Sequence, residues 1–209
     1  RRVAPVLERL RRSKVYSPRI LPFYVQAVFG LCVMGTALMV RMLKPWMARK
    51  LVHVGVGLLL VHSDLEDWKI RWAVYAVTVI TFAVCTGRMK RYVRFLHQDM
   101  RMDPGITTYV ATCSVCCAFG IPFVSIAPLF FADPMGAIVG RNVASPRIYG
   151  SKTLAGTMAV SGTAFLTLSD PSVANRCVAA FMIGGIELVA GDFDNPCIAA
   201  FLLSRAIAV

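Results

Sequence analysis

Residues 131–157, FADPMGAIVGRNVASPRIYGSKTLAGT, form the stretch around which the rest of the chain is organised. Apolar segments lie on both sides of it, one ending at Phe131 and the next starting near Met158. Asp133 therefore falls at or near membrane depth, where an ionisable side chain is costly and by default functional. The residues after it supply cations, a hydroxyl and flexible backbone: Gly140, Arg141, Gly150, Lys152 and Thr153. Such groups bind phosphate, whereas carboxylates bind divalent metals. We therefore expect a phosphate-handling site at a membrane surface.

The composition around this stretch is typical of an integral membrane protein. Of the 209 residues, 57% are hydrophobic and only 16% are charged, and the mean hydropathy is +0.63. Soluble domains usually carry about 25% charged residues. The apolar runs are long and unbroken, which favours helices over the short alternating strands of a membrane barrel. A span needs roughly 20 residues. We therefore expect an all-α polytopic bundle of about seven spans, with a kinked span and re-entrant or interfacial segments near the site.

The net charge of +12 bears on the partners of the protein. In a membrane protein such an excess reflects topology and attraction to anionic lipid headgroups, or else an anionic substrate. The basic residues punctuate the apolar segments and form no continuous stripe, so nucleic acid is not expected as a partner. Cys113, Cys116 and Cys117 invite a metal interpretation, but no matching ligand pair occurs elsewhere, and buried thiols are the simpler explanation.

The chain divides into a basic N-terminal arm, residues 1–20, and a single transmembrane helical domain, residues 21–209. The arm is similar to the end of an organellar transit sequence or to a basic amphipathic surface helix. We expect an intracellular membrane (endoplasmic reticulum, plastid or mitochondrial inner membrane), and the Arg-rich arm favours an organelle. Pro122, Pro128 and Pro134 predict that the fifth span is broken or kinked. The apolar segments are 21–43, 48–61, 68–86, 106–120, 121–139, 158–168, 173–190 and a short last stretch, 197–209.

Three polar islands interrupt this apolar background. Each has an ordinary explanation: basic side chains that snorkel to headgroups, a hydrogen-bonded core histidine, or a solvated turn that caps a helix. Three islands in so apolar a chain nevertheless point together to one site. In chain order they are Arg49, Lys50 and His53; Asp133, Gly140, Arg141, Lys152 and Thr153; and Glu187, Asp192, Asp194 and Asn195.

The islands resemble the motifs of the CTP-dependent polyprenol and lipid kinases. This family comprises dolichol kinase, phytol/farnesol kinase and yeast-type diacylglycerol kinase, and is distantly similar to phosphatidate cytidylyltransferases. Its R-K-x-x-H-x-x-x-G pattern matches residues 49–57. Its D-x-x-A-x-x-V-G-R pattern is similar to residues 133–141, with Gly136 at the alanine position and Ala137 directly after it. Its K-[ST]-x-x-G-[ST] pattern matches residues 152–157, and its late E…D-D-N pattern is similar to residues 187–195. The insertion of residues 142–147 and the early Pro196 depart from the family.

The resemblance implies Mg²⁺-dependent transfer of the γ-phosphate of CTP, or of another nucleotide, to the hydroxyl of a polyprenol-type or acylglycerol lipid. It implies catalytic roles for His53, Asp133 and Lys152, with His53 orienting or deprotonating the lipid hydroxyl, although an Asp could do the same. It implies that the nucleotide phosphates contact Arg49, Lys50, Gly140, Arg141, Thr153 and Gly156. The implied Mg²⁺ ligands are Asp133, Glu187, Asp192, Asp194 and Asn195.

Other functions stay open. A cytidylyltransferase acting on phosphatidate would use similar acids and bases, but its chains and signature are longer. A kinase-like structural subunit of a larger membrane complex, for instance a mitochondrial one with partner subunits, would fit the insertion and the basic arm. Against it, drift in an inactive homologue should first erase costly intramembrane acids. A transporter is less compatible, because no paired broken helices occur in two halves.

Overall fold

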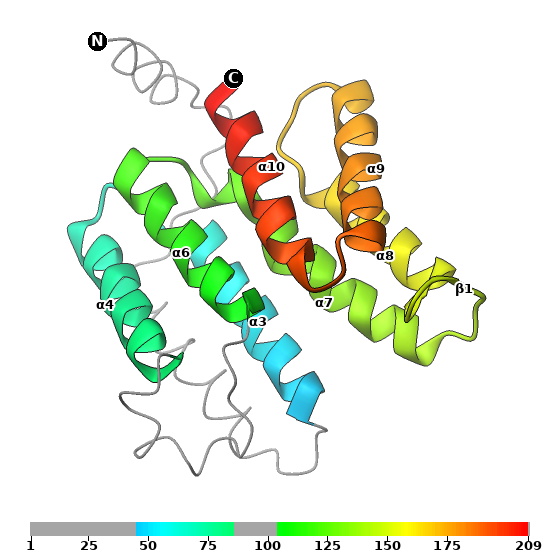
Figure 1. Ribbon diagram of the computed structural model, residues 1–209. Helices are drawn as coiled ribbons and strands as arrows, with labels where there is room; N and C mark the ends of the chain where they lie inside the picture. Colours follow the sequence, from blue (N-terminus) through cyan, green and yellow to red (C-terminus); the bar gives the residue numbers. More distant parts are fainter. Residues whose placement is uncertain (1–44, 86–103, 209) are drawn as a thin grey trace.

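The computed structural model describes residues 45–85 and 104–208, and this part of the chain is predominantly helical, as the apolar runs predict. The basic arm and the segment 21–43 lie outside the described residues. A short antiparallel hairpin, β1 (Arg147–Tyr149) and β2 (Lys152–Thr153), connects two of the helices. The helices, shown in Figure 1, are α3 (Pro45–Val61), α4 (Trp68–Cys85), α6 (Pro104–Phe119), the 3-10 helix η1 (Phe123–Ile126), α7 (Ala127–Asn142), α8 (Leu154–Thr167), α9 (Val173–Val189), the 3-10 helix η2 (Gly191–Phe193) and α10 (Asp194–Ala208).

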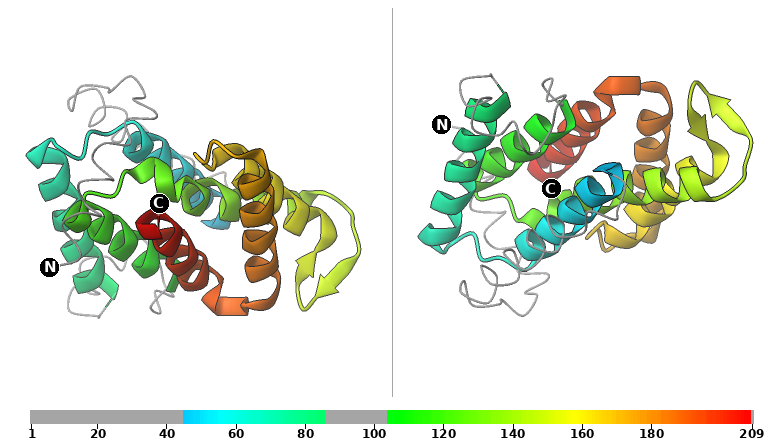
Figure 2. Two further views of the ribbon diagram at one scale, coloured as in Figure 1. Left: turned by 90° about the horizontal axis from the view of Figure 1, so that it is seen from above. Right: turned by 90° about the horizontal axis from the view of Figure 1, so that it is seen from below.

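Helix α7 lies at the centre of this arrangement. It packs against α3 and α8 and also contacts α10, so that elements from both ends of the described chain meet along it (Figures 1 and 2). The core around it is apolar and almost fully excluded from solvent, with Ile121, Ile126, Phe130, Ile183 and Leu202 among its buried side chains. The close packing of these side chains, through many small dispersion contacts, holds the helices together.

Prolines shape the segment that the sequence predicts as a broken or kinked span, where a 3-10 turn precedes an α-helix. Pro122 precedes η1, whose 3-10 turn ends at Ile126, and Pro128 lies in the first turn of α7. A proline in a first turn removes no intrahelical hydrogen bond, which is why α7 can begin there. Pro134 lies inside α7, which nevertheless runs on to Asn142. The break therefore lies upstream of the acid at Asp133.

Glycines allow α7 and α8 to cross closely. A methyl group added at Gly136 of α7 would lie 2.4 Å from Cγ2 of Val160, and one added at Gly156 of α8 would lie 3.1 Å from the carbonyl oxygen of Gly136. One turn further along α7, a methyl group at Gly140 would lie 3.4 Å from Cα of Gly156. Small residues spaced four apart are a common way for membrane helices to approach. The crossing places the C-terminal half of α7 beside the start of α8.

Two elements differ from the sequence predictions, one in its type and one in its start. The hairpin is the first, and its base is tied to α8 by a hydrogen bond from Leu154 N to the carbonyl oxygen of Pro146 at 3.0 Å. The second is α10, which begins at Asp194 rather than at Cys197. Pro196 therefore belongs to the first turn of α10, where a proline is tolerated, and the late acidic island is partly helical.

Several predicted spans that fall within the described residues are shorter than a membrane span. One helical stretch, Phe123–Asn142, is long and apolar enough to cross a membrane, judged by length and composition. Shorter apolar helices cover Lys50–Val61, Gly105–Phe119 and Leu154–Thr167. The described residues thus establish a helical fold with one candidate span.

Candidate functional site

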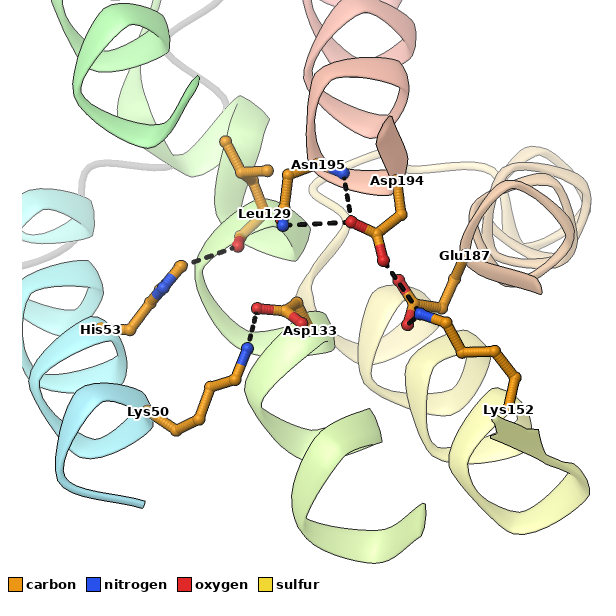
Figure 3. Close-up of polar contacts among 8 residues, drawn as sticks. All are labelled: Lys50, His53, Leu129, Asp133, Lys152, Glu187, Asp194 and Asn195. Carbon is orange, nitrogen blue, oxygen red and sulfur yellow. Dashed lines mark hydrogen bonds and ion pairs between the residues drawn. The ribbon is translucent and has the colours of Figure 1, made fainter. Parts of the chain in front are cut away.

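The three polar islands meet at α7 (Figure 3). Lys50 of α3 donates to Oδ2 of Asp133 on α7 and forms an ion pair with it. Lys152 of β2 forms ion pairs with Glu187 of α9 and with Asp194 at the start of α10, the latter at 2.9 Å from Nζ to Oδ2. Side chains that are far apart in the sequence, from α3, α7, β2, α9 and α10, are therefore brought into one region.

A pocket of about 230 Å³ opens between α7, the hairpin, α8 and α9. Small-molecule pockets are typically about 300–1,000 Å³, so this one has room for a lipid headgroup or for the phosphate part of a nucleotide. Neutral polar lining comes from Ser151, Thr153 and Thr157. The charged lining consists of Asp133, Arg141, Lys152 and Glu187. A pocket with two cations and two carboxylates can bind an anion and accept a proton or a cation in the same space.

Lys152 is held as a cation between two carboxylates. Glu187 is only 7% exposed, and its Oε1 accepts from Lys152, while Asp194 accepts from the same ammonium group. Burial tends to lower the pKa of Lys152, but the hydrogen bonds and charges of Glu187 and Asp194 outweigh it and leave that pKa raised. Lys152 is therefore an ammonium ion at neutral pH, as a phosphate-binding role requires.

Two buried oxygens at the pocket have no hydrogen-bond partner among the described residues: Oε2 of Glu187 and Oγ1 of Thr157. Leaving a buried polar atom unpaired costs about 1–3 kcal/mol, and native structures rarely tolerate it without a reason. A ligand that offered a donor or a cation to Glu187 would remove this cost. Thr157 is absent from the predicted site residues, although it is the hydroxyl that ends the pattern at residues 152–157.

The start of α8 borders the pocket. Thr153 caps this helix, since its Oγ1 accepts from the backbone N–H of Gly156 at 3.2 Å. Helix N-termini attract anions, because their free N–H groups and the helix dipole favour negative charge. Thr153 and Gly156 therefore have structural roles, as a cap and as a close-packing site, in the same place where the resemblance implies phosphate contacts.

His53 lies away from this pocket, whose lining does not include it. Its Nε2 is 3.2 Å from the carbonyl oxygen of Leu129, and its ring meets that of Tyr109 edge-on with the centroids 4.3 Å apart. Figure 3 shows the imidazole directed at the backbone of α7, one turn before Asp133. These contacts agree with the ordinary explanation of His53 as a hydrogen-bonded core histidine, and its catalytic role stays a prediction.

Among the other predicted phosphate contacts, Arg141 lines the pocket from the last turn of α7. Lys50 donates to Asp133, a residue of the pocket lining, but does not itself line the pocket. The side chain of Arg49 lies outside the described residues.

The predicted Mg²⁺ ligands come together in part. Glu187 and Asp194 share Lys152, and Asn195 supports Asp194 by donating to its Oδ1 from Nδ2 at 3.2 Å. Asp133 pairs with Lys50 instead, and Asp192 is exposed on η2. In the described ranges, no group of three or more His, Cys, Asp or Glu side chains could hold a metal. Mg²⁺ is often held by one or two carboxylates plus substrate phosphates. Of the carboxylate oxygens of Glu187 and Asp194, three accept from Lys152 or Asn195, and Oε2 of Glu187 has no partner among the described residues.

No family model, curated protein or solved structure matches the chain. The function is therefore argued from the geometry of the pocket and from the motifs that meet around it.

Proposed function

We propose that the protein is a membrane lipid kinase that transfers the γ-phosphate of CTP, or of another nucleotide, to the hydroxyl of a polyprenol-type or acylglycerol lipid. The observation that carries this proposal is one pocket whose lining combines cations and carboxylates from the second and third polar islands. Lys50 of the first island pairs with Asp133, which is part of that lining. Ion pairs that served only stability would need no pocket between them. The motif resemblance to the CTP-dependent lipid kinases supports the same conclusion.

The surface of the helices supports a polytopic membrane bundle of about seven spans. Large apolar side chains point outward, including Trp72 on α4, Leu166 on α8 at 78% exposure and Phe181 on α9 at 79%. Extended apolar surface is costly in water but is the normal lipid-facing surface of a membrane protein. Helices α4 and α9, of 18 and 17 residues, approach the roughly 20 residues of a span. The location that we propose for this bundle, an intracellular membrane, rests on the Arg-rich arm of the sequence.

Phosphoryl transfer depends mainly on positioning and charge neutralisation. Arg141 and Lys152, beside the N-terminus of α8, would hold the phosphate oxygens, and the guanidinium of Arg141 suits bidentate contact. Glu187 and Asp194 would hold Mg²⁺, which neutralises phosphate charge when it is bound. Asp133 is the better candidate to accept the proton of the lipid hydroxyl, since it lines the pocket while His53 contacts Leu129. Lys50 would hold the carboxylate of Asp133 in place.

One observation favours a second candidate, a kinase-like structural subunit of a larger membrane complex. The carboxylates of Asp133, Glu187 and Asp194 each form an ion pair with a lysine of the same chain, the last two with the same lysine. Such pairs also stabilise a fold that no longer binds nucleotide. No observation in the described part of the chain favours a cytidylyltransferase over these two candidates.

Transfer of labelled γ-phosphate to a panel of lipid alcohols in detergent tests the proposal. The panel contains phytol, farnesol, dolichol and diacylglycerol, each with CTP, UTP and ATP. The variant is Asp133→Asn, and the matched control is Glu66→Gln, an exposed acid in the turn after α3. We expect transfer to one lipid by the wild type and the control, and a loss of roughly 100-fold or more in Asp133→Asn. No transfer by folded wild type with any pair would favour the structural subunit.

A further inference from the structure

We propose that the hairpin segment, residues 143–153, docks into the headgroup layer of an anionic bilayer at the mouth of the pocket. The inference rests on the proposed membrane insertion of the helices and does not require phosphoryl transfer. The partner that we propose for the hairpin segment is the lipid surface itself.

The hairpin segment directly follows the candidate span. That span, Phe123–Asn142, ends where α7 ends, and α8 begins at Leu154. A connection between two membrane helices emerges at the boundary of lipid and water, so residues 143–153 lie at that boundary when α7 crosses the bilayer. Figure 2 shows the hairpin at one edge of the described residues in both views, beyond the end of α7.

The charge of this region is entirely positive. Residues 134–169 contain no Asp or Glu, whereas Arg141, Arg147 and Lys152 fall inside this range. Lys152 faces inward to Glu187 and Asp194, so Arg147, which is exposed on β1, carries the outward charge of the hairpin. An anionic lipid surface attracts each nearby Lys or Arg by about 1 kcal/mol.

The side chains that follow Arg147 suit a headgroup layer. Ile148 is 48% exposed and Tyr149 is 59% exposed, and no residue of β1 is buried. Tyrosine is enriched at membrane interfaces because its ring is apolar and its hydroxyl is polar. A lipid boundary accommodates a cation, an aliphatic side chain and a tyrosine side by side, which favours lipid over a purely acidic protein partner.

The hairpin is anchored to the pocket, so its docking has a consequence there. Hydrogen bonds join Leu154 N to Pro146 O at 3.0 Å and Ala155 N to Ser145 Oγ at 3.1 Å, fixing its base on α8. Its second half contributes Ser151 and Lys152 to the pocket lining. Contact between the hairpin and lipid therefore holds the pocket at the depth of the headgroups, where a lipid hydroxyl would lie.

Hydrogen exchange of the full chain in nanodiscs tests the inference, with phosphatidylcholine alone or mixed with phosphatidylserine. The readout is the exchange rate of amides in residues 143–153. We expect exchange to slow several-fold when phosphatidylserine is present, and we expect Arg147→Glu to abolish this difference. Lys69→Glu, at an exposed lysine at the start of α4, makes the same charge change elsewhere and should leave the difference intact.

Equal exchange in both lipids, or a difference that Arg147→Glu leaves unchanged, would overturn the inference. Failure of the chain to enter nanodiscs would overturn both the inference and the membrane bundle. The readout needs no nucleotide and no turnover. A lipid-dependent difference in exchange, found in a protein without kinase activity, would therefore support the inference and contradict the proposed kinase function.

Discussion

Lys50 of α3 and Asp133 of α7 form an ion pair beside the candidate site, although they lie 83 positions apart in the chain. The side chains are 25% and 14% exposed, so the pair is intermediate between a surface pair and a buried one. It joins α3 to the central helix at the point where Asp133 lines the pocket. The pair therefore connects the stability of the bundle with the placement of a candidate catalytic acid.

Lys50→Met is expected to destabilise the protein by about 1–3 kcal/mol, because it leaves Asp133 partly buried without its cation. Adding Asp133→Asn to Lys50→Met should recover part of this loss, since no unpaired charge remains. Thermal unfolding in a mild detergent measures both effects, with Lys69→Met on α4 as the control. Equal stability of Lys50→Met and the wild type would mean that the pair contributes nothing to the fold.

The close crossing of α7 and α8 gives a second prediction. Gly136→Ala would push a methyl group to 2.4 Å from Cγ2 of Val160, and overpacking of this kind costs about 1–3 kcal/mol. Gly162→Ala on the same α8 meets nothing within 4 Å and should be neutral or stabilising by up to about 1 kcal/mol. The two variants are compared by thermal unfolding. Equal changes in stability for the two variants would mean that the crossing of α7 and α8 does not require a glycine at position 136.

The sequence predicts the helices well because their apolar runs are long, and it predicts the break before α7 because proline has a known local effect. It does not predict the hairpin, since residues 147–153 carry no strong alternation and the two strands are very short. It does not predict the start of α10 either, because Pro196 ends a helix in one context and begins one in another. Such choices depend on packing against elements that are distant in the sequence.

The same contrast applies to the candidate site. Motif spacing predicts that the islands belong together, but it says nothing of which cation meets which acid. Lys50 appears from sequence as a phosphate contact and lies instead against Asp133, and His53 appears as a base and contacts the backbone of Leu129. Thr157 gains importance only from burial, which places its hydroxyl at the pocket without a partner in the described part of the chain.

The cation between Glu187 and Asp194 gives a third prediction. Lys152→Met removes it and leaves the buried carboxylate of Glu187 uncompensated, which typically costs about 3–5 kcal/mol for a buried pair. A second change, Glu187→Gln, made together with Lys152→Met, should restore part of the lost stability because it removes the buried charge. The free energies of unfolding of the wild type, Lys152→Met and the double variant are compared by thermal unfolding. A double variant no more stable than Lys152→Met would show that the two side chains are not energetically coupled.

The neighbouring acids Asp192 and Asp194 allow the proposed Mg²⁺ donor set to be tested within one turn of chain. Asp194 is directed at Lys152 and is supported by Asn195, whereas Asp192 is exposed on η2. If Glu187 and Asp194 hold the metal, Asp194→Asn should raise the Mg²⁺ concentration needed for half-maximal transfer by roughly 10–100-fold. Asp192→Asn has the same chemistry and should leave this concentration nearly unchanged. The measurement is γ-phosphate transfer at a series of Mg²⁺ concentrations after chelation. Equal effects of the two substitutions would contradict the two-carboxylate donor set and return Asp192 to the site.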